Sequence, residues 1–399
     1  MFEGFGCDIP EDATTAKNHI RCAIPLCRGG HGIAQNNETV SGSSLPVGGE
    51  KKRDVSGNPS KRVGKQTILF PQSPNLTSTA TVAGPKEGQG PFGQFFDAVK
   101  EDTLLGEKSW EGAERKIVEE AVQLALKKAG LGPTEVDCLL AGDLLNQIIS
   151  SSYAARELSI PFLGLYGACA TLSEALILAA ILVDSGYAHY AVAVASSHHD
   201  TAERQYRYPT EFANQRPPTA QWTVTGAGAA LVGKSPNFPR ITHATIGKVI
   251  DMGVSDPNDM GGAMAAAASD TIWQHLQDTE RSPRDYDLIL TGDLGEVGSA
   301  SALRLLRQAG VDISAVHQDC GLLIFDRARQ NVQAGGSGCA CSGLVFCGPV
   351  YQRLLSGELR RVLLVATGSL HSPCSVQQGQ SIPGIAHAVA IEGVSREED

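Results

Sequence analysis

Cys169 is the residue of this sequence best placed for nucleophilic chemistry. It lies between a buried apolar stretch and the start of the apolar run 170–185. At a helix start, unpaired backbone N–H groups and the helix dipole favour a thiolate and hold an adjacent oxyanion. A small buried thiol that only fills space beneath the helix fits the same position. Cys339, in the small-residue stretch 335–341, takes the equivalent place in the second half of the chain and is a pocket candidate by that symmetry.

A second group of candidate residues follows a predicted strand at 190–195. The segment 196–208 mixes histidines, carboxylates, guanidinium groups and phenols at the carboxyl end of that strand, where α/β sheets bind ligands. This mixture suits hydrogen bonding to, and stacking on, a planar charged aromatic compound. A solvated loop or a subunit contact is the plainer interpretation. The ligand-binding candidates here are His198, His199, Glu203, Arg204 and Arg207.

Two aspartates occupy matching turns. Asp143 lies in LLAGDL (139–144) and Asp293 in ILTGDL (289–294), each at the end of a predicted buried strand. Their carboxylates either face a ligand or a calcium ion, or cap the turns.

The elements that must position these residues form a duplicated α/β pattern. Apolar residues at helical spacing over 117–126 predict a helix that Gly130 caps. Strands are expected at 136–141, 161–166 and 190–195, with an apolar helix at 170–185 between the last two. The second half repeats this order, at an offset of 150 for the Gly-Asp turns (293 minus 143) and 171 for the glycines before the helix (338 minus 167). We expect halves at 64–240 and 241–399 after a disordered extension, 1–63.

Composition excludes several classes of protein. With a net charge of -10, the 399-residue chain lacks the basic surface that nucleic acid needs. No apolar run approaches the roughly 18 residues of a membrane span, and no secretory signal opens the sequence. The ten cysteines are expected to be free thiols. The stretch 228–235 matches a P-loop pattern, but it is predicted to be a strand followed by prolines, which excludes a phosphate loop there.

These features resemble the thiolase and ketoacyl synthase superfamily, which has two duplicated halves and a nucleophilic cysteine at a helix start. Within it, longer motifs resemble the stage V sporulation protein AD family from residue 64 to about 392. The motifs are GKQT (64–67), YGACAT (166–171), TAERQYR (201–207), PTAQWTVTG (218–226) and DCG (319–321).

The resemblance implies an α/β, thiolase-like fold with two βαβαβ halves stacked in five layers, α-β-α-β-α, and a homodimer. It implies binding of dipicolinic acid in the old active-site cleft, with calcium accompanying the ligand, no cofactor and no metal site of the chain's own. It also implies uptake of this ligand into the forespore during sporulation, together with other proteins of the stage V A operon, membrane subunits included. The location implied is peripheral, at the spore inner membrane or in the forespore cytoplasm.

The residues opposite Cys169 predict that the condensing reaction is lost. Condensing enzymes of this superfamily need polar residues there, commonly His, and Asn or Cys, to bind or protonate a thioester carbonyl. This chain has TGD (291–293) and GSG (336–338) at those places. We therefore expect a binding protein, with charge-assisted contacts from Arg204 or Arg207 and hydrogen bonds from Cys169 and His198.

Two alternatives stay open. One is a Cys169-dependent acyltransferase or ketoacyl synthase-like enzyme, which a histidine beside the Cys169 sulfur would favour. The other is a structural partner of membrane proteins that binds no ligand.

Overall fold

The computed structural model describes residues 61–207 and 216–394. Of the predicted extension 1–63, residues 1–60 lie outside this part of the chain. Its last residues are ordered rather than disordered: β1 (Arg62–Val63) pairs with β2 (Thr67–Leu69). The turn between them is fixed because Asp278 accepts hydrogen bonds from the backbone N–H groups of Lys65 and Gln66, at 2.9 and 2.8 Å.

Two βαβ units of the same topology follow. The first half contains β3 (Asn75–Ala83), α1 (Pro85–Gly88), β4 (Ala98–Val99), α2 (Trp110–Ala129), β5 (Cys138–Gly142), α3 (Ile149–Leu158), β6 (Phe162–Gly164), α4 (Thr171–Asp184), β7 (Ala191–Ser197), α5 (His199–Tyr206), β8 (Trp222–Thr223) and β9 (Gly226–Gly233). The second contains β10 (Arg240–Thr245), α6 (Met260–Thr279), β11 (Leu288–Thr291), α7 (Gly295–Gln308), β12 (His317–Asp319), α8 (Cys320–Leu323), β13 (Gly336–Ser337), α9 (Cys339–Val345), α10 (Tyr351–Leu355), β14 (Arg361–Ser369), α11 (Pro373–Gln377) and β15 (Gly384–Glu392). The stretch 228–235 matches a P-loop pattern but was predicted to be a strand, and it lies mostly in β9.

The strand order shows the duplication. It runs β6-β5-β7-β9-β3 in the first half and β12-β11-β14-β15-β10 in the second. In each half the first three strands are parallel and the last two pairings are antiparallel. The two half-sheets join at one edge, where Arg240 of β10 pairs with Asn75 of β3. The N-terminal strand β2 belongs to the sheet of the second half, because it pairs with β10.

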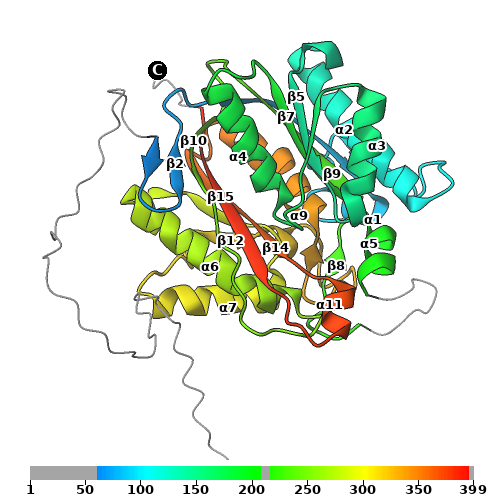
Figure 1. Ribbon diagram of the computed structural model, residues 1–399, viewed down its shortest axis with the longest axis vertical. Helices are drawn as coiled ribbons and strands as arrows, with labels where there is room; N and C mark the ends of the chain where they lie inside the picture. Colours follow the sequence, from blue (N-terminus) through cyan, green and yellow to red (C-terminus); the bar gives the residue numbers. More distant parts are fainter. Residues whose placement is uncertain (1–60, 208–215, 395–399) are drawn as a thin grey trace, which may run out of the picture. The chain divides into compact units, whose positions relative to one another are not determined.

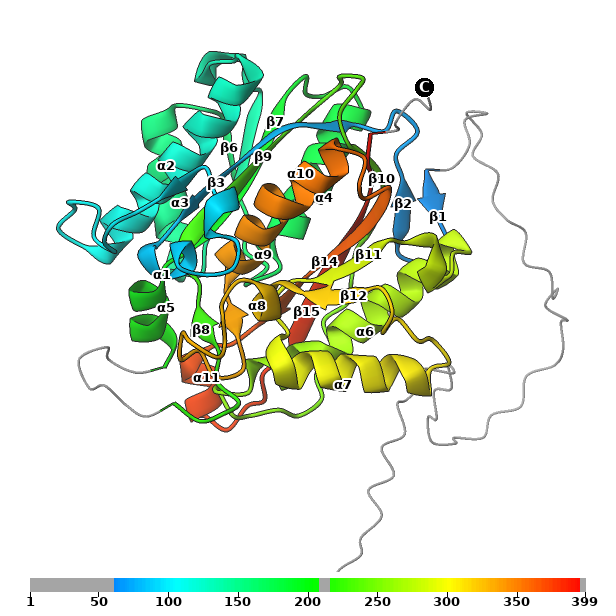
Figure 2. The same ribbon diagram turned by 180° about the vertical axis from the view of Figure 1, so that it is seen from behind.

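The halves stack as five layers, as expected for a thiolase-like fold. Helices α2 and α3 cover the outer face of the first sheet, and α6 and α7 cover the outer face of the second. Helices α4 and α9 lie between the sheets, where both contact strand β7 and α4 also contacts β14 and β15 (Figures 1 and 2).

Helix α2 shows why the sequence pattern was a reliable guide. The Ser109 hydroxyl accepts a hydrogen bond from the Gly112 N–H at 3.1 Å and caps the start. Gly130 ends the helix with a φ of 71°, a left-handed conformation that glycine adopts without strain. The apolar stripe predicted from spacing is the buried face of the helix.

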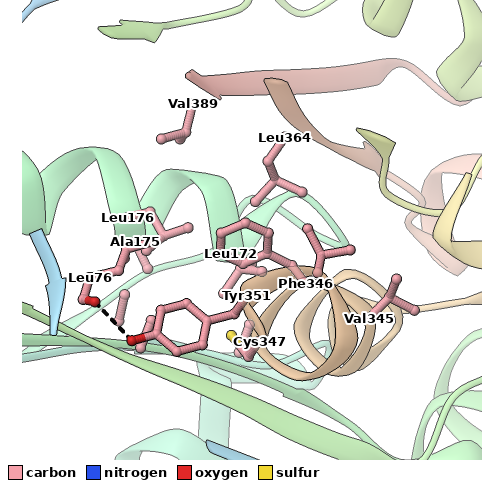
Figure 3. Close-up of a cluster of buried hydrophobic side chains, with 14 of the residues drawn as sticks. Leu76, Leu172, Ala175, Leu176, Val345, Phe346, Cys347, Tyr351, Leu364 and Val389 are labelled. Atoms are coloured by element: carbon pink, nitrogen blue, oxygen red, sulfur yellow. Dashed lines mark hydrogen bonds between the residues drawn. The ribbon is translucent and has the colours of Figure 1, made fainter. Parts of the chain in front are cut away.

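The core between the sheets is built from the central helices. Figure 3 shows side chains of α4, of the helical segment 339–355, which is kinked at Gly348, and of strands β14 and β15 packed together. Those labelled include Leu172, Leu176, Phe346, Tyr351, Leu364 and Val389. The Tyr351 hydroxyl, buried here, donates to the Leu76 carbonyl at 3.0 Å, so its polar atom is satisfied. This packing holds the start of α4, and with it Cys169, at a fixed depth between the halves.

Candidate functional site

Cys169 lies in a tight turn between β6 and α4. The residue before it, Ala168, has a φ of 49°, a left-handed conformation that is strained for a residue with a side chain. Thr171 holds the turn: its hydroxyl donates to the Ala168 carbonyl at 2.6 Å and accepts from the Gly167 N–H at 3.1 Å. Gly368 of β14 packs on this turn so closely that an added Cβ would come 2.5 Å from the Gly167 carbonyl oxygen. The turn is therefore clamped between the two halves.

The Cys169 thiol is paired with a carboxyl group. Asp293, fully buried after β11, is hydrogen-bonded to the thiol and also accepts from the Thr367 hydroxyl at 2.7 Å and the Gly338 N–H at 2.9 Å. Burial raises the pKa of Asp293 to about 7. Burial, and then the charge of Asp293, raise the pKa of Cys169 well above its ordinary value. The thiol is therefore held protonated at neutral pH, the opposite of an activated nucleophile.

A small cavity opens beside this thiol. Its volume is about 30 Å³, which is room for about one water molecule. We call it the Cys169 cavity, and its lining comes from both halves of the fold. The lining residues are Leu144, Tyr166, Ala168, Cys169, Ala202, Tyr206, Arg207, Thr223, Met260, Ser337, Ser369 and His371.

Two of the polar groups in this lining were not predicted from the sequence. Ser369, the last residue of β14, is buried, and its hydroxyl has no hydrogen-bond partner among the described residues. His371 follows two residues later, and burial lowers its pKa to about 4. Its ring lies 5.6 Å from that of Tyr206, centroid to centroid, and no hydrogen bond joins it to Cys169 within the described chain. The adjoining cavity leaves room for a water molecule or a ligand atom to pair with the Ser369 hydroxyl.

The signal for these two residues was in the duplication. The offset of 171 that aligns the strands maps the segment 198–200, singled out after β7, onto 369–371 after β14. When the offset of 171 is applied to the polar residues as well as to the strands, it predicts Ser369 and His371 at the carboxyl end of β14.

Arg207 brings a cation to the cavity and is held by a buried carboxylate. Its Nε donates to Glu203 Oε2 at 3.0 Å, a second nitrogen also binds Glu203, and its side chain is 4% exposed. Arg216 adds a further ion pair to Glu203 at 3.3 Å. Burial opposes ionisation of Glu203, but the two arginines outweigh it, so the pKa of Glu203 lies below its ordinary value. Glu203 therefore acts on the site through Arg207.

Tyrosines form the outer wall. The hydroxyl groups of Tyr166 and Tyr206 lie 2.9 Å apart, and that of Tyr206 also donates to the Leu144 carbonyl. Tyr166 is 46% exposed, so this wall borders solvent.

Other predicted site residues do not line the cavity. His198 is fully buried with both ring nitrogens engaged, one 2.8 Å from the Thr103 carbonyl and the other accepting from the Asp200 N–H at 3.2 Å. It caps the start of α5 and does not reach a ligand in this cavity, contrary to the prediction. His199 stacks on Trp222 at 3.9 Å between centroids and accepts from Arg216.

Arg204, Asp143 and Cys339 are also placed elsewhere. Arg204 lies on the surface, where it pairs with Glu111, so of the two predicted arginines Arg207 is the one at the cavity. Asp143 is buried and accepts from the Ser151 hydroxyl at 2.7 Å and from the Leu145 N–H at 2.9 Å, so it caps its turn. The Cys339 thiol donates to the Ala168 carbonyl at 3.1 Å and supports the Cys169 turn from behind.

A calcium site on the protein does not fit this arrangement. The oxygens of Asp143 and Asp293 already accept hydrogen bonds inside the core, and no group of three or more metal-ligating side chains occurs in the residues described. The seven cysteines of the described ranges are free thiols, as predicted. Across the same ranges, no helix is both long and apolar enough to cross a membrane.

Two larger hollows lie away from Cys169. One, of about 490 Å³, is lined by charged side chains of α2 and of the segment 100–105. The other, of about 420 Å³, is lined by residues of β3, α2 and α10. The side chains that line them are tied into ion pairs and core hydrogen bonds such as Lys100–Glu120 and Lys128–Asp97.

The five-layer fold with a cysteine at the start of a central helix defines a thiolase-like protein. Solved structures with this fold include OleA from Xanthomonas campestris, with a TM-score of 0.53 and 15% identity over 81% of this chain and 99% of that one. The 3-oxoacyl-[acyl-carrier-protein] synthase III of Aquifex aeolicus gives a TM-score of 0.50 and 12% identity, over 80% of this chain and 99% of the synthase.

Within that class, residues 64–392 match the family described as stage V sporulation protein AD. The chain is also 51% identical to the stage V sporulation protein AD of Bacillus subtilis (strain 168), over 83% of this chain and 98% of the relative. The chain belongs to the stage V sporulation protein AD family.

Proposed function

We propose that this chain acts in sporulation by binding dipicolinic acid in the Cys169 cavity and supporting its uptake into the forespore. The observation that carries the binding proposal is the cavity lining, where a guanidinium, an unpartnered hydroxyl and an imidazole converge beside a thiol that is not activated. The name of its relatives supports the role in sporulation.

The chemistry of the lining suits a planar dianion. Arg207 supplies a positive charge for one carboxylate, while Ser369 and His371 supply hydrogen bonds to the other. The rings of Tyr206 and His371 offer faces against which a pyridine ring stacks. A pyridine dicarboxylate is several times larger than the present cavity, so binding requires the tyrosine wall to move outward.

Catalysis is lost in this proposal because the site works against a thiolate. An acyl-transfer cysteine needs a base or a positive charge beside it. Here burial disfavours the thiolate, the negative charge of Asp293 disfavours it further, and the thiol stays protonated.

The remaining parts of the proposal concern partners. In this proposal calcium arrives with the ligand and is not held at a metal site formed by the described residues. The protein works as a homodimer, peripherally at the spore inner membrane or in the forespore cytoplasm, with other proteins of the stage V A operon. The exposed edge strand β6, with Leu163 49% exposed beside Tyr166, supports the dimer.

Calorimetric titration with dipicolinate, with and without calcium, tests the binding. Wild type is expected to bind, and Arg207→Gln to lose roughly 10- to 100-fold in affinity through the lost charge-assisted hydrogen bonds. Ser369→Ala, which leaves the Glu203–Arg207 ion pair intact, is expected to lower the affinity about fivefold. Arg204→Gln is the matched control: it removes a nearby arginine that does not line the cavity, and its affinity is expected to equal that of wild type. Absence of binding to wild type in both conditions contradicts the proposal.

One observation favours the second candidate, a Cys169-dependent acyltransferase: His371 shares the cavity with the thiol. Incubation with acyl-coenzyme A thioesters followed by intact-mass measurement separates the two. A stable acyl adduct that disappears in Cys169→Ser establishes the enzyme, and an unmodified protein supports binding alone.

A further inference from the structure

Resting on the proposed function, we propose that the Cys169 cavity takes up a proton when it binds its dianionic ligand, at Asp293 and His371. Ligand binding is thereby coupled to pH, and the protein holds its ligand more tightly in acidic than in alkaline surroundings.

The charges around the cavity carry this inference. Among the lining residues described, Arg207 carries the one fixed positive charge, and it shares Glu203 with Arg216, so this cluster of two guanidinium groups and one carboxylate has one net positive charge. Asp293 is not one of the lining residues, but it contacts the Cys169 thiol, which is. A dianion that enters therefore adds two negative charges against one net positive charge, and the excess negative charge in a buried site is costly unless a proton follows.

The groups that face Asp293 offer no counter-charge. They are the Cys169 thiol, the Thr367 hydroxyl of β14, the Gly338 N–H before α9 and, further off, the carboxyl of Asp319 at the end of β12. The buried thiols of Cys320, Cys339 and Cys341, which also lie near Asp293, add no cation. Asp319 raises the pKa of Asp293 further, after burial. A proton is therefore the cation most readily added at this place.

His371 is the second acceptor. The groups that face it are the Tyr206 ring and the Arg207 guanidinium, and burial and then Arg207 lower its pKa to about 4, so it is neutral in the ligand-free protein. A carboxylate beside it, which also engages Arg207, offsets the charge of Arg207 and stabilises the protonated imidazole against the effect of burial. A nearby anion raises the pKa of an acid and of a base alike, so both groups bind protons more tightly in the complex.

The direction of the pH effect follows by linkage. Because the complex holds more protons than the free protein, ligand affinity rises as pH falls from 8 to 6, by up to about tenfold per pH unit for each proton taken up.

Calorimetric titration of the full chain with pyridine-2,6-dicarboxylate in phosphate and in Tris at pH 7 counts these protons. The two buffers differ in ionisation enthalpy, so uptake of about one proton shows as a difference between the observed heats. Titrations at pH 6, 7 and 8 are expected to give the matching decline in affinity.

Three variants locate the protons. Asp293→Asn, which keeps an acceptor for the Gly338 N–H, and His371→Gln are each expected to bind ligand with reduced proton uptake. Glu87→Gln is the matched control: Glu87 is a fully buried carboxyl whose pKa burial also raises to about 7, but it does not line the cavity. Its variant is expected to show the wild-type uptake.

The outcomes separate this inference from the function on which it rests. Binding with equal heats in both buffers and no pH dependence overturns proton uptake and leaves dipicolinate binding intact. Uptake that is unchanged in both Asp293→Asn and His371→Gln also overturns it. Absence of binding in every buffer overturns the proposed function and this inference together.

Discussion

At the scale of single residues, burial and then one carboxyl group, that of Asp293, keep the Cys169 thiol protonated. The turn geometry, the strained Ala168 and the helix start all favour a nucleophile. Asp293 opposes them, because its charge and its hydrogen bond stabilise the protonated thiol. Cys169 therefore occupies a position suited to a nucleophile, in surroundings that keep its thiol protonated.

Asp293→Asn is therefore expected to make Cys169 more reactive. Removing the charge lowers the pKa of the thiol, and each pKa unit increases the thiolate fraction about tenfold. Alkylation by iodoacetamide at pH 8, followed by peptide mass spectrometry, measures the rate at Cys169. The exposed Cys374 provides an internal reference. An equal Cys169 rate in variant and wild type would mean that burial alone suppresses the thiol.

The direction in which side chains point was the least predictable feature of the site. His198 and Arg204 lie in the segment that the sequence singled out, yet one turns into the core and the other lies on the surface. Residue type and position do not decide this, because the partners that turn them, Thr103 and Glu111, come from a distant part of the chain. The position of Cys169 at a helix start was predictable from the sequence, but its raised pKa was not, because Asp293 comes from the second half of the chain.

At the scale of elements, α2 brings a second buried carboxyl group beneath the site. Glu114 accepts hydrogen bonds from the Ser196 hydroxyl at 3.0 Å and the Thr201 hydroxyl at 3.2 Å, which ties α2 to β7 and α5. Burial, and then the nearby Asp143, raise the pKa of Glu114 to about 8. The carboxyl group that ties α2 to α5 is therefore protonated at neutral pH.

The raised pKa of Glu114 predicts a pH effect on stability. A carboxyl whose pKa is raised on folding contributes stability that is fully present below its unfolded value of 4.5 and is lost as pH rises towards about 8. The loss is about 1 kcal/mol per pH unit for one proton. Urea unfolding at pH 5, 6.5 and 8 is expected to show the free energy of unfolding of Glu114→Gln gaining on wild type as pH rises. Glu120→Gln, on the outer side of the same helix, is the control and should keep a constant difference.

Elements with strong local patterns were predicted well. Helix α4 and strands β5 and β7 lie within about two residues of their predicted ranges, because periodicity is a property of the segment itself. Helix α2 ends at the predicted cap, Gly130, but begins at Trp110, seven residues before the apolar stripe predicted from spacing. Strand β6 is shorter than the predicted 161–166, since only Phe162 to Gly164 find partners on β5.

At the scale of the whole molecule, the duplication was predictable and the joining of the halves was not. Repeated offsets revealed two similar units. The pairing of β2 with β10, and the single Arg240–Asn75 link between half-sheets, depend on strands that carry no sequence signal for their partner.

The exposed edge strand β6 leads us to a prediction about the oligomeric state. Leu163→Glu is expected to convert the proposed dimer to monomer, because it places a charge where an apolar side chain is 49% exposed on an unpaired edge. Light scattering coupled to size-exclusion chromatography measures the mass. Leu355→Glu, at a residue 40% exposed on α10, is the control and should leave the mass unchanged. A Leu163→Glu protein of wild-type mass places the dimer interface elsewhere.

The pairing of β2 with the sheet of the second half affects the order in which the protein can fold during its synthesis. Thr67 meets Thr245 across 178 positions of sequence, and a ribosome adding roughly 5 to 20 residues per second needs on the order of 10 to 40 s to supply the partner. During that interval strand β2, at the start of the chain's ordered part, has no β10 with which to pair. Completion of the thiol-bearing site between the halves thus belongs to the last stage of synthesis.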